Sequence, residues 1–180
     1  IDMGWGGDMR HVLQWIEVAD EMFRGDAARS DMVLHGISMG ASTVMNVAGS
    51  MPPACVRCVV EDCGYTSVWD EFAHELDDMF GLPQFPLMHT TSALCKVRYG
   101  WTFGQANSLK QLEQCHLPML FIHGDNDDFV PTAMAHSLYD AKPQPKQLWL
   151  APGSIHARAY SDHPAEYTMQ VRDFVEQYCR

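Results

Sequence analysis

The sequence predicts an α/β protein, with a parallel sheet of about four strands flanked by helices and a helical cap insertion. Short apolar runs alternate with longer stretches of helical periodicity, which is typical of parallel strands joined by right-handed crossovers. A segment of about fifty residues between the second and third runs shows no strand and is too long for a plain connection. We therefore expect a single domain over residues 1–180, with the cap at about 66–116.

Strands are expected where apolar and β-branched residues run together between turn residues. The run at 118–122 is apolar at every position, as in a parallel strand that is buried on both faces. The predicted strands cover about 32–37, 56–61, 118–122 and 147–150.

Helices are expected where apolar residues recur every three or four positions. The first such stretch, from Met9 to Phe23, ends before Gly25 and has the pattern of an amphipathic helix that covers a sheet. The segment 83–103 is rich in proline and aromatic residues, and no element is assigned to it. The other predicted helices cover about 39–49, 68–80, 108–115, 132–141 and 164–178.

Composition and charge exclude several kinds of partner. With 180 residues, 47% of them hydrophobic, the chain can bury a substantial core. The net charge of −11 argues against nucleic acids and anionic membranes as partners. No run of about twenty apolar residues is present, so we expect no membrane span.

Six cysteines and nine histidines bear on redox state and metal binding. Cys55 and Cys58 form one C-x-x-C, without the second pair that a zinc site of this type needs. The histidines lack H-E-x-x-H spacing. We expect free thiols in a reducing, cytoplasmic setting, and neither a metal nor another cofactor.

A G-x-S-x-G motif, Gly36-Ile37-Ser38-Met39-Gly40, lies between a predicted strand and a predicted helix. In a nucleophile elbow the glycines permit a strained turn that lifts the serine hydroxyl above the sheet edge. Ser38 is the predicted nucleophile, and the N–H of Met39 is a predicted oxyanion donor. The alternative is that Ser38 only caps the helix.

A candidate acid and a candidate base follow the last two predicted strands. Asp127 lies in the loop after 118–122, and His156 in the loop after 147–150. An aspartate can orient the imidazole, and the imidazole can take the serine proton and later return it. Other candidates are Asp62, Asp125 and Asp128 for the acid, and His35, His123 and His163 for the base. Of these, Asp125 and His123 are expected to shape the turn, and His35 to be structural.

These motifs resemble the α/β-hydrolase superfamily, and are most similar to cap-bearing prokaryotic serine hydrolases such as esterases, lipases and serine aminopeptidase-like proteins. The resemblance runs along all 180 residues and implies that Ser38 is the nucleophile, Asp127 the acid and His156 the base. The stretches that carry it are 3–5, 34–41, 61–69, 123–131 and 156–160.

The chain resembles only the C-terminal half of that fold, whose sheet usually has about eight strands. The family loop that supplies the second oxyanion N–H has no counterpart before Ser38. Loss of one such donor lowers rates by about a hundred- to a thousandfold, so we expect reduced activity. The strand near Val33 should become an exposed edge, which predicts a homo-oligomer formed through it.

The predicted function is hydrolysis of small carboxylic esters with short- to medium-chain acyl groups, through an acyl-enzyme. One alternative is an amidase or peptidase with the same residues, although the sequence shows no clear acidic pocket for a substrate amino group. The other is a catalytically impaired fragment that serves as a folding or association module. Cap residues expected to line an apolar acyl pocket are Phe85, Leu87, Met88, Trp101 and Phe103.

Overall fold

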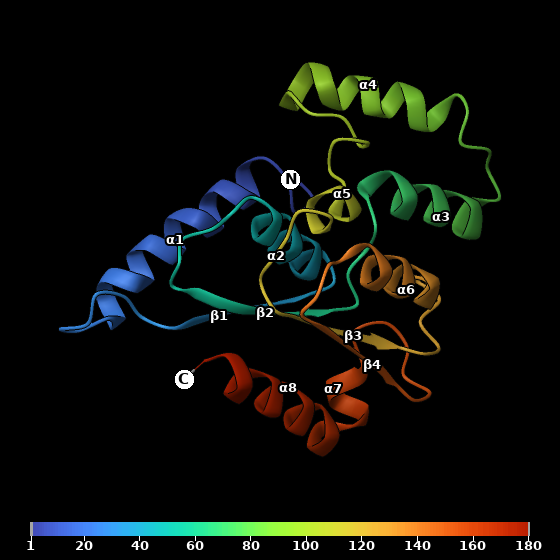
Figure 1. The fold of residues 1–180 in the computed structure, drawn as a ribbon. Helices are drawn as coiled ribbons and strands as arrows, with labels where there is room; N and C mark the ends of the chain where they lie inside the picture. Colours follow the sequence, from blue (N-terminus) through green and yellow to red (C-terminus); the bar gives the residue numbers. More distant parts are fainter. Residues whose placement is uncertain (1, 180) are drawn as a thin grey trace.

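A computed structural model describes residues 2–179 and shows one parallel sheet with the strand order β1-β2-β3-β4 (Figure 1). Each strand pairs in parallel with the next, so all four carboxyl ends meet at one edge of the sheet. The strands are β1 (Met32–Ile37), β2 (Val56–Asp62), β3 (Met119–Gly124) and β4 (Lys146–Ala151).

Helices cover both faces of this sheet. In Figure 1, α1, α2, α5 and α6 lie on one side of the strands and α7 and α8 on the other, while α3 and α4 stand farther from the sheet, above α2 and α6. The helices are α1 (Gly7–Phe23), α2 (Met39–Gly49), α3 (Val68–Phe80), α4 (Leu87–Tyr99), α5 (Ser108–Leu112), α6 (Thr132–Ala141), α7 (Ala159–Asp162) and α8 (Pro164–Tyr178).

The predicted fold class is confirmed: a four-stranded parallel sheet lies between helices. The helices expected at 39–49, 68–80, 132–141 and 164–178 have the same bounds in the structure. Each predicted strand is present, with ends that differ by two residues or fewer. The short α5 ends at Leu112, three residues before the predicted end.

Sequence reasoning missed α4. Its buried residues are Met88, Ser92 and Cys95, of which only the first is a strong signal of an apolar face. Leu94 and Val97, which are strongly apolar, are 63% and 85% exposed. Because apolar residues lie on the outer side of α4, the sequence shows no amphipathic pattern there.

The core has two layers because alternate residues of a strand point to opposite faces of the sheet. Met119 and Phe121 pack with residues of α2, α5 and α6. Leu120 and Ile122 pack on the other face with Phe174 of α8. The complete burial of β3 on both faces explains its continuous apolar sequence.

The insertion between β2 and β3 contains α3, α4 and α5. The first two helices share a separate apolar cluster with Tyr65, Trp101 and Phe103. By contrast, Leu112 of α5 belongs to the main core next to α2. Within the insertion, α3, α4 and the loop after α4 therefore pack through a cluster outside the main core, and Val130 and Met134 join this cluster.

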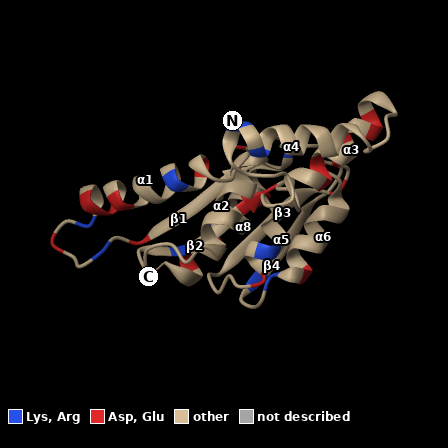
Figure 2. Ribbon diagram, turned by 90° about the horizontal axis from the view of Figure 1, so that it is seen from above, with Lys and Arg blue, Asp and Glu red and all other residues tan. Residues whose placement is uncertain are grey.

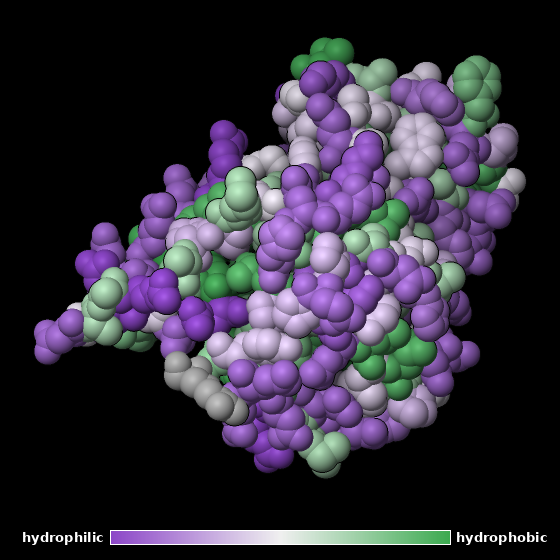
Figure 3. Space-filling model, in the orientation of Figure 1, coloured by the Kyte–Doolittle hydropathy of each residue, from purple (hydrophilic) through white to green (hydrophobic). Residues whose placement is uncertain are grey.

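The strand β1 lies at an edge of the described sheet. A groove of about 330 Å³ runs between α1 and β1, and Figure 3 shows hydrophobic surface in this region. Its lining includes Trp15, Ile16 and Val33. That a second copy of the chain pairs with this edge stays a prediction. Within residues 2–179, no helix combines the length and the apolar character required to cross a membrane.

The turn from β1 into α2 depends on one close backbone approach. Ser38 has φ 56° and ψ −120°, which is an unfavourable conformation for a residue other than glycine. A Cβ atom on Gly36 would overlap the backbone of Gly40, whereas one on Gly40 would meet nothing within 4 Å. The first glycine is therefore required by packing, and the second is not.

We predict that Gly36→Ala lowers the free energy of unfolding by about 1–3 kcal/mol or more, as overpacked sites do. Gly40→Ala is the matched control, and should leave stability unchanged or raise it by about 0.5–1 kcal/mol because it removes a glycine from a helix. Urea denaturation followed by circular dichroism measures both. Equal losses in the two variants would contradict this account of the turn.

Candidate active site

Three loops at the carboxyl edge of the sheet bring together the serine, histidine and aspartate singled out from the sequence. The Oγ of Ser38 lies 2.9 Å from Nε2 of His156. The Nδ1 of that histidine lies 2.9 Å from Oδ2 of Asp127. We call these three residues the Ser–His–Asp cluster.

The strained turn holds Ser38 so that its hydroxyl faces His156. The backbone N–H of Ser38 donates to the carbonyl of Asp62 at the end of β2, at 2.8 Å. Ser38 occupies the N-cap position of α2, yet its side chain makes no capping hydrogen bond. The simple capping alternative therefore does not describe this hydroxyl.

The loop after β3 holds Asp127 from several sides. Its Oδ1 accepts hydrogen bonds from the N–H groups of Phe129 and Val130, at 3.1 and 2.9 Å. Its Oδ2 accepts from His156 and also lies 3.3 Å from Nε2 of His123. Burial disfavours the charged carboxylate, but these contacts outweigh burial and lower the pKa of Asp127 to about 2. Asp127 is thus ionised at neutral pH.

The other acids near the site have different partners. Asp62 is buried and accepts a hydrogen bond from the hydroxyl of Tyr167 at 3.0 Å. Asp125 accepts from the N–H of Gly153, which ties the loop after β3 to the loop after β4. Asp128 is exposed. Among these carboxylates, the hydrogen bond to His156 belongs to Asp127.

The competing histidines also have structural partners. His35 contacts the hydroxyl of Tyr167 at 2.9 Å. His123 is fully buried and its Nε2 donates to the carbonyl of Val130 at 2.8 Å, which braces the acidic loop. His163 lies 2.8 Å from a backbone carbonyl in the loop after β4. His156 is the histidine in contact with the serine hydroxyl.

Met39 is the first residue of α2. The first N–H groups of a helix have no partner within the helix, and they form the positive end of its dipole. The N–H of Met39, directly after Ser38, is thus one of the groups that could stabilise a developing oxyanion. The side chain of Met39 is 42% exposed. That Met39 is an oxyanion donor stays a prediction.

The five residues predicted to line an acyl pocket do not lie together. Leu87, Met88 and Phe103 line a groove of about 240 Å³ between α3 and α4. Trp101 is buried and lines a different cavity, of about 420 Å³, that Phe103 also borders. Phe85 is 72% exposed and its ring contacts His89 instead.

Sequence reasoning did not single out Glu71 of α3. Its side chain is buried, and its Oε2 has no hydrogen-bond partner within the described part of the chain. Burial, and then repulsion from Glu75, raise the pKa of Glu71 to about 7, against the opposing effect of His156. The available signal was the composition of this helix, which contains five acidic residues and no Lys or Arg.

Cys63 lies beside the Ser–His–Asp cluster. Ligand atoms of Cys63, Asp127 and His156 all lie within 4.8 Å of one another, a spacing that could hold a small metal ion. Metal ligation requires a thiolate. Burial, and then the charge of Asp62, raise the pKa of Cys63 well above its usual range, which disfavours that form. His156 Nδ1 and Asp127 Oδ2 already contact each other at 2.9 Å, and we assign no metal to these residues.

The fold and this arrangement define an α/β-hydrolase-type site. A sequence profile of the prolyl oligopeptidase family matches residues 6–180. The chain therefore belongs to the prolyl oligopeptidase family, and the prediction of an α/β-hydrolase-fold serine hydrolase is confirmed at that level.

Solved structures with this fold include several hydrolases. An esterase of Pyrococcus furiosus superimposes with a TM-score of 0.71 at 17% identity, covering 96% of this chain and 62% of that one. An esterase domain from Rhodothermus marinus superimposes with a TM-score of 0.64 at 19% identity, covering 93% of this chain and 69% of that one. Pyrococcus horikoshii acylaminoacyl peptidase superimposes with a TM-score of 0.65 at 17% identity, covering 95% of this chain and 28% of that one. At these identities the likeness shows the fold alone.

Two curated relatives carry the description of uncharacterised proteins. YqkD of Bacillus subtilis is 29% identical over 143 residues, which are 79% of this chain and 47% of YqkD. YfhR of Escherichia coli K12 is 27% identical over 153 residues, or 84% and 48%. The chain thus spans about half the length of the curated relatives it matches.

We predict that Asp127→Asn slows covalent labelling of Ser38 by a fluorophosphonate about a thousand- to ten-thousandfold, because the amide no longer supports a charged imidazole. The neighbouring, exposed Asp128→Asn is the matched control and should label at the original rate. Labelling followed by intact-protein mass spectrometry gives both rates. Similar rates in the two variants would remove Asp127 from the site.

We also predict that Glu71→Gln raises the thermal midpoint at pH 8. A carboxyl whose pKa is raised on folding destabilises the protein fully above its folded pKa of about 7, and not at all below its unfolded pKa. Removing the charge should raise the thermal midpoint by about 2–4 °C for each kcal/mol gained in the free energy of unfolding. This increase in the midpoint should vanish near pH 4, where the carboxyl group is protonated in both states. The exposed Glu21→Gln serves as control. A gain that does not depend on pH would contradict this assignment.

Proposed function

We propose that the chain carries the catalytic residues of a serine hydrolase that cleaves carboxylic esters through an acyl-enzyme. The observation that carries the proposal is the continuous hydrogen-bonded path from Ser38 Oγ through His156 to Asp127, with both contacts at 2.9 Å. A serine hydroxyl is a weak nucleophile on its own and is activated by a base at this distance. Family membership supports the hydrolase class.

In the acylation step, Ser38 Oγ bonds to the ester carbonyl carbon while its proton passes to Nε2 of His156. Asp127 remains ionised and stabilises the imidazolium. The carbonyl oxygen becomes an oxyanion that accepts a hydrogen bond from the N–H of Met39. The tetrahedral intermediate then collapses, the bond to the alcohol oxygen breaks, and the alcohol leaves with the proton from His156.

In the deacylation step, His156 takes a proton from water as the water oxygen bonds to the acyl carbon. The second tetrahedral intermediate releases the carboxylic acid, and the proton returns to Ser38. The same two steps cleave an amide, in which the leaving group is an amine.

In this proposal the groove between α3 and α4 binds the acyl group, and its size suits a short- to medium-chain one. It measures about 240 Å³ and its lining includes Phe72, Leu87, Met88 and Phe103, which are apolar. Burial of each methylene in such a groove contributes about 0.8 kcal/mol, so affinity should increase until the groove is full.

Amide hydrolysis is the second candidate. The prolyl oligopeptidase family name and the likeness to an acylaminoacyl peptidase favour it. Esterases among the structural neighbours favour esters. Parallel assays with p-nitrophenyl esters and p-nitroanilides of the same acyl group separate the two activities.

We predict that the chain hydrolyses p-nitrophenyl esters, with kcat/KM rising with acyl length up to about eight carbons if each added methylene is buried. Ser38→Ala should abolish turnover. The matched control is Ser50→Ala at the exposed C-terminal end of α2, which should stay active. Initial rates at 400 nm give all three values. Turnover that Ser38→Ala leaves intact, or absence of turnover in the original chain, would favour the association-module alternative.

A further inference from the structure

Glu71 is a buried carboxyl group that the proposed mechanism does not use. Its side chain is only 5% exposed, and Oε2 has no hydrogen-bond partner within residues 2–179. Buried polar atoms in native proteins are nearly always hydrogen-bonded, so each exception requires an explanation. A carboxylate is also an acceptor only, and its natural partner is a donor that carries positive charge.

Glu71 lies within electrostatic range of the Ser–His–Asp cluster. His156 and Asp127 both act on its carboxyl, and it acts in turn on the hydroxyl of Tyr65 in the loop after β2. Its neighbours on α3, His74 and Glu75, act on it as well. The titratable groups that interact electrostatically with Glu71 are Tyr65 from the loop after β2, His74 and Glu75 from α3, Asp127 from the loop after β3, and His156 from the loop after β4.

The helix α3 supplies no basic counter-ion for this carboxyl. Five of its thirteen residues are acidic and none is Lys or Arg. Figure 2 shows red residues and no blue ones along α3. The ion pairs of the described residues involve no residue of this helix. A positive group brought by a ligand would therefore meet a negative field that His156 and His74 offset only in part.

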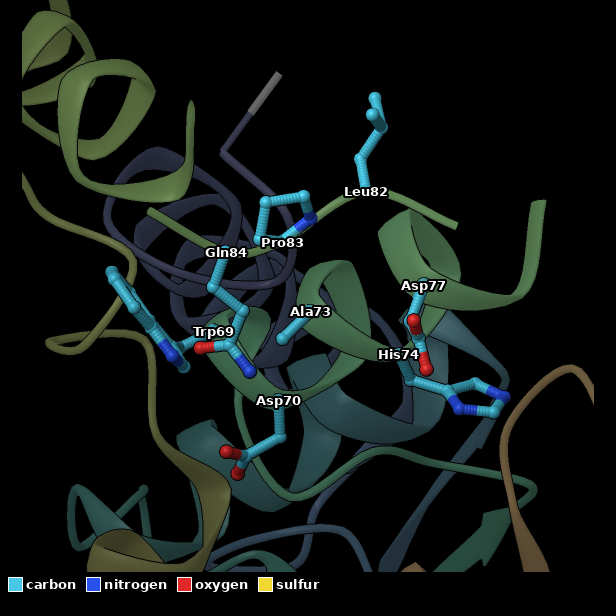
Figure 4. Close-up of a pocket in the computed structure, with 8 residues that line it drawn as sticks. All are labelled: Trp69, Asp70, Ala73, His74, Asp77, Leu82, Pro83 and Gln84. Atoms are coloured by element: carbon cyan, nitrogen blue, oxygen red, sulfur yellow. The ribbon is translucent and has the colours of Figure 1, made fainter. Parts of the chain in front are cut away.

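A cavity of about 530 Å³ whose lining includes two aspartates lies on a different face of α3 from Glu71. Figure 4 shows Asp70, His74 and Asp77 along it, beneath the chain at residues 82–84. Residues spaced by three and four share a helix face, which places Asp70 and Asp77 away from Glu71 and Glu75. This cavity therefore does not adjoin the Ser–His–Asp cluster through Glu71.

Glu75 connects Glu71 to the apolar groove. It is one turn further along α3 and lines the groove with Leu87 and Met88. The charge of His156 also acts on the Glu75 carboxyl. Glu75 thus lines the proposed acyl groove, and both carboxyl groups interact electrostatically with His156, the proposed base.

We propose that Glu71, supported by Glu75, binds a positively charged group of the substrate, so that the substrates are esters or amides with an ammonium group near the scissile carbonyl. This inference rests on the proposed function and specifies its substrate class. The ammonium group forms a charge-assisted contact with Glu71 and compensates its buried charge, while the reaction steps at Ser38 stay as described.

Two pairs of esters that differ only in charge test this proposal. The first pair is p-nitrophenyl 4-(trimethylammonio)butyrate and its carbon analogue p-nitrophenyl 5,5-dimethylhexanoate, with the charge on the acyl side. The second is butyrylcholine and 3,3-dimethylbutyl butyrate, with the charge on the alcohol side. We expect kcat/KM to favour the cationic member of at least one pair by about ten- to a hundredfold. Preference for the neutral member in both pairs, or no preference, would overturn the proposal.

The ratio of the two kcat/KM values within a pair is the readout for variants, because effects on the Ser–His–Asp cluster cancel in it. Glu71→Gln should bring the ratio close to one, and Glu75→Gln should lower it in part. The exposed Glu21→Gln on α1 should leave it unchanged. In the unsubstituted chain the ratio should rise between about pH 6 and pH 8 as Glu71 ionises. A ratio that Glu71→Gln does not change would remove this residue from the cation site.

Binding measured without turnover separates this inference from the proposed function. Choline should raise the thermal midpoint of the unsubstituted chain at pH 8, and 3,3-dimethylbutanol should not. The effect of choline should disappear in Glu71→Gln. If choline binds in this way but no ester is hydrolysed, the cation site stands and the proposed hydrolysis fails. If esters are hydrolysed but choline does not bind and neither cationic ester is preferred, the hydrolase stands and the cation site fails.

Discussion

The tight turn from β1 into α2 is the constraint on which the rest of the site depends. It keeps Ser38 at a positive φ that an ordinary loop would relax. The strain persists because α2 is buried from Ala41 to Gly49 and because the Ser38 N–H is held by the end of β2. The absence of a side chain at Gly36 lets the two backbone segments approach. Rigid packing thus fixes the serine hydroxyl at the edge of the sheet.

The parallel sheet makes this one position useful. Because all four strands end at the same edge, the loops that follow them lie close together at that edge. Several polar groups are buried just beneath these loops, including Glu61, Asp62 and His123. The N–H of Gly64 and the hydroxyl of Tyr167 offset part of the cost of burying the two carboxyls. These buried polar contacts help to fix the loops, in which Asp127 and His156 form a hydrogen bond although they are 29 residues apart.

The insertion between β2 and β3 adds a separate layer with a different kind of chemistry. Its apolar cluster packs α3 and α4 together and joins them to Val130 and to Met134 of α6. That packing allows α3 to hold Glu71 in a buried and uncompensated state, which lowers stability. Proteins retain such local costs where binding or reaction needs them. The scaffold and the acidic helix therefore contribute differently: the first positions reactive groups, and the second provides charge.

Local patterns in the sequence determined the strands, most helices, the turn at Ser38 and the order in which serine, acid and base follow their strands. These features depend on periodicity and turn chemistry, which act over a few residues and can be identified along the chain. The sequence favoured Asp127 through the family resemblance but left Asp125 and Asp128 as alternatives. Only the tertiary structure showed which of them contacts His156, because that hydrogen bond depends on loop geometry at the scale of an ångström. The tertiary structure alone also revealed α4 and the burial of Glu71. Both depend on contacts between segments far apart in sequence, and such contacts leave no periodic signal in the chain.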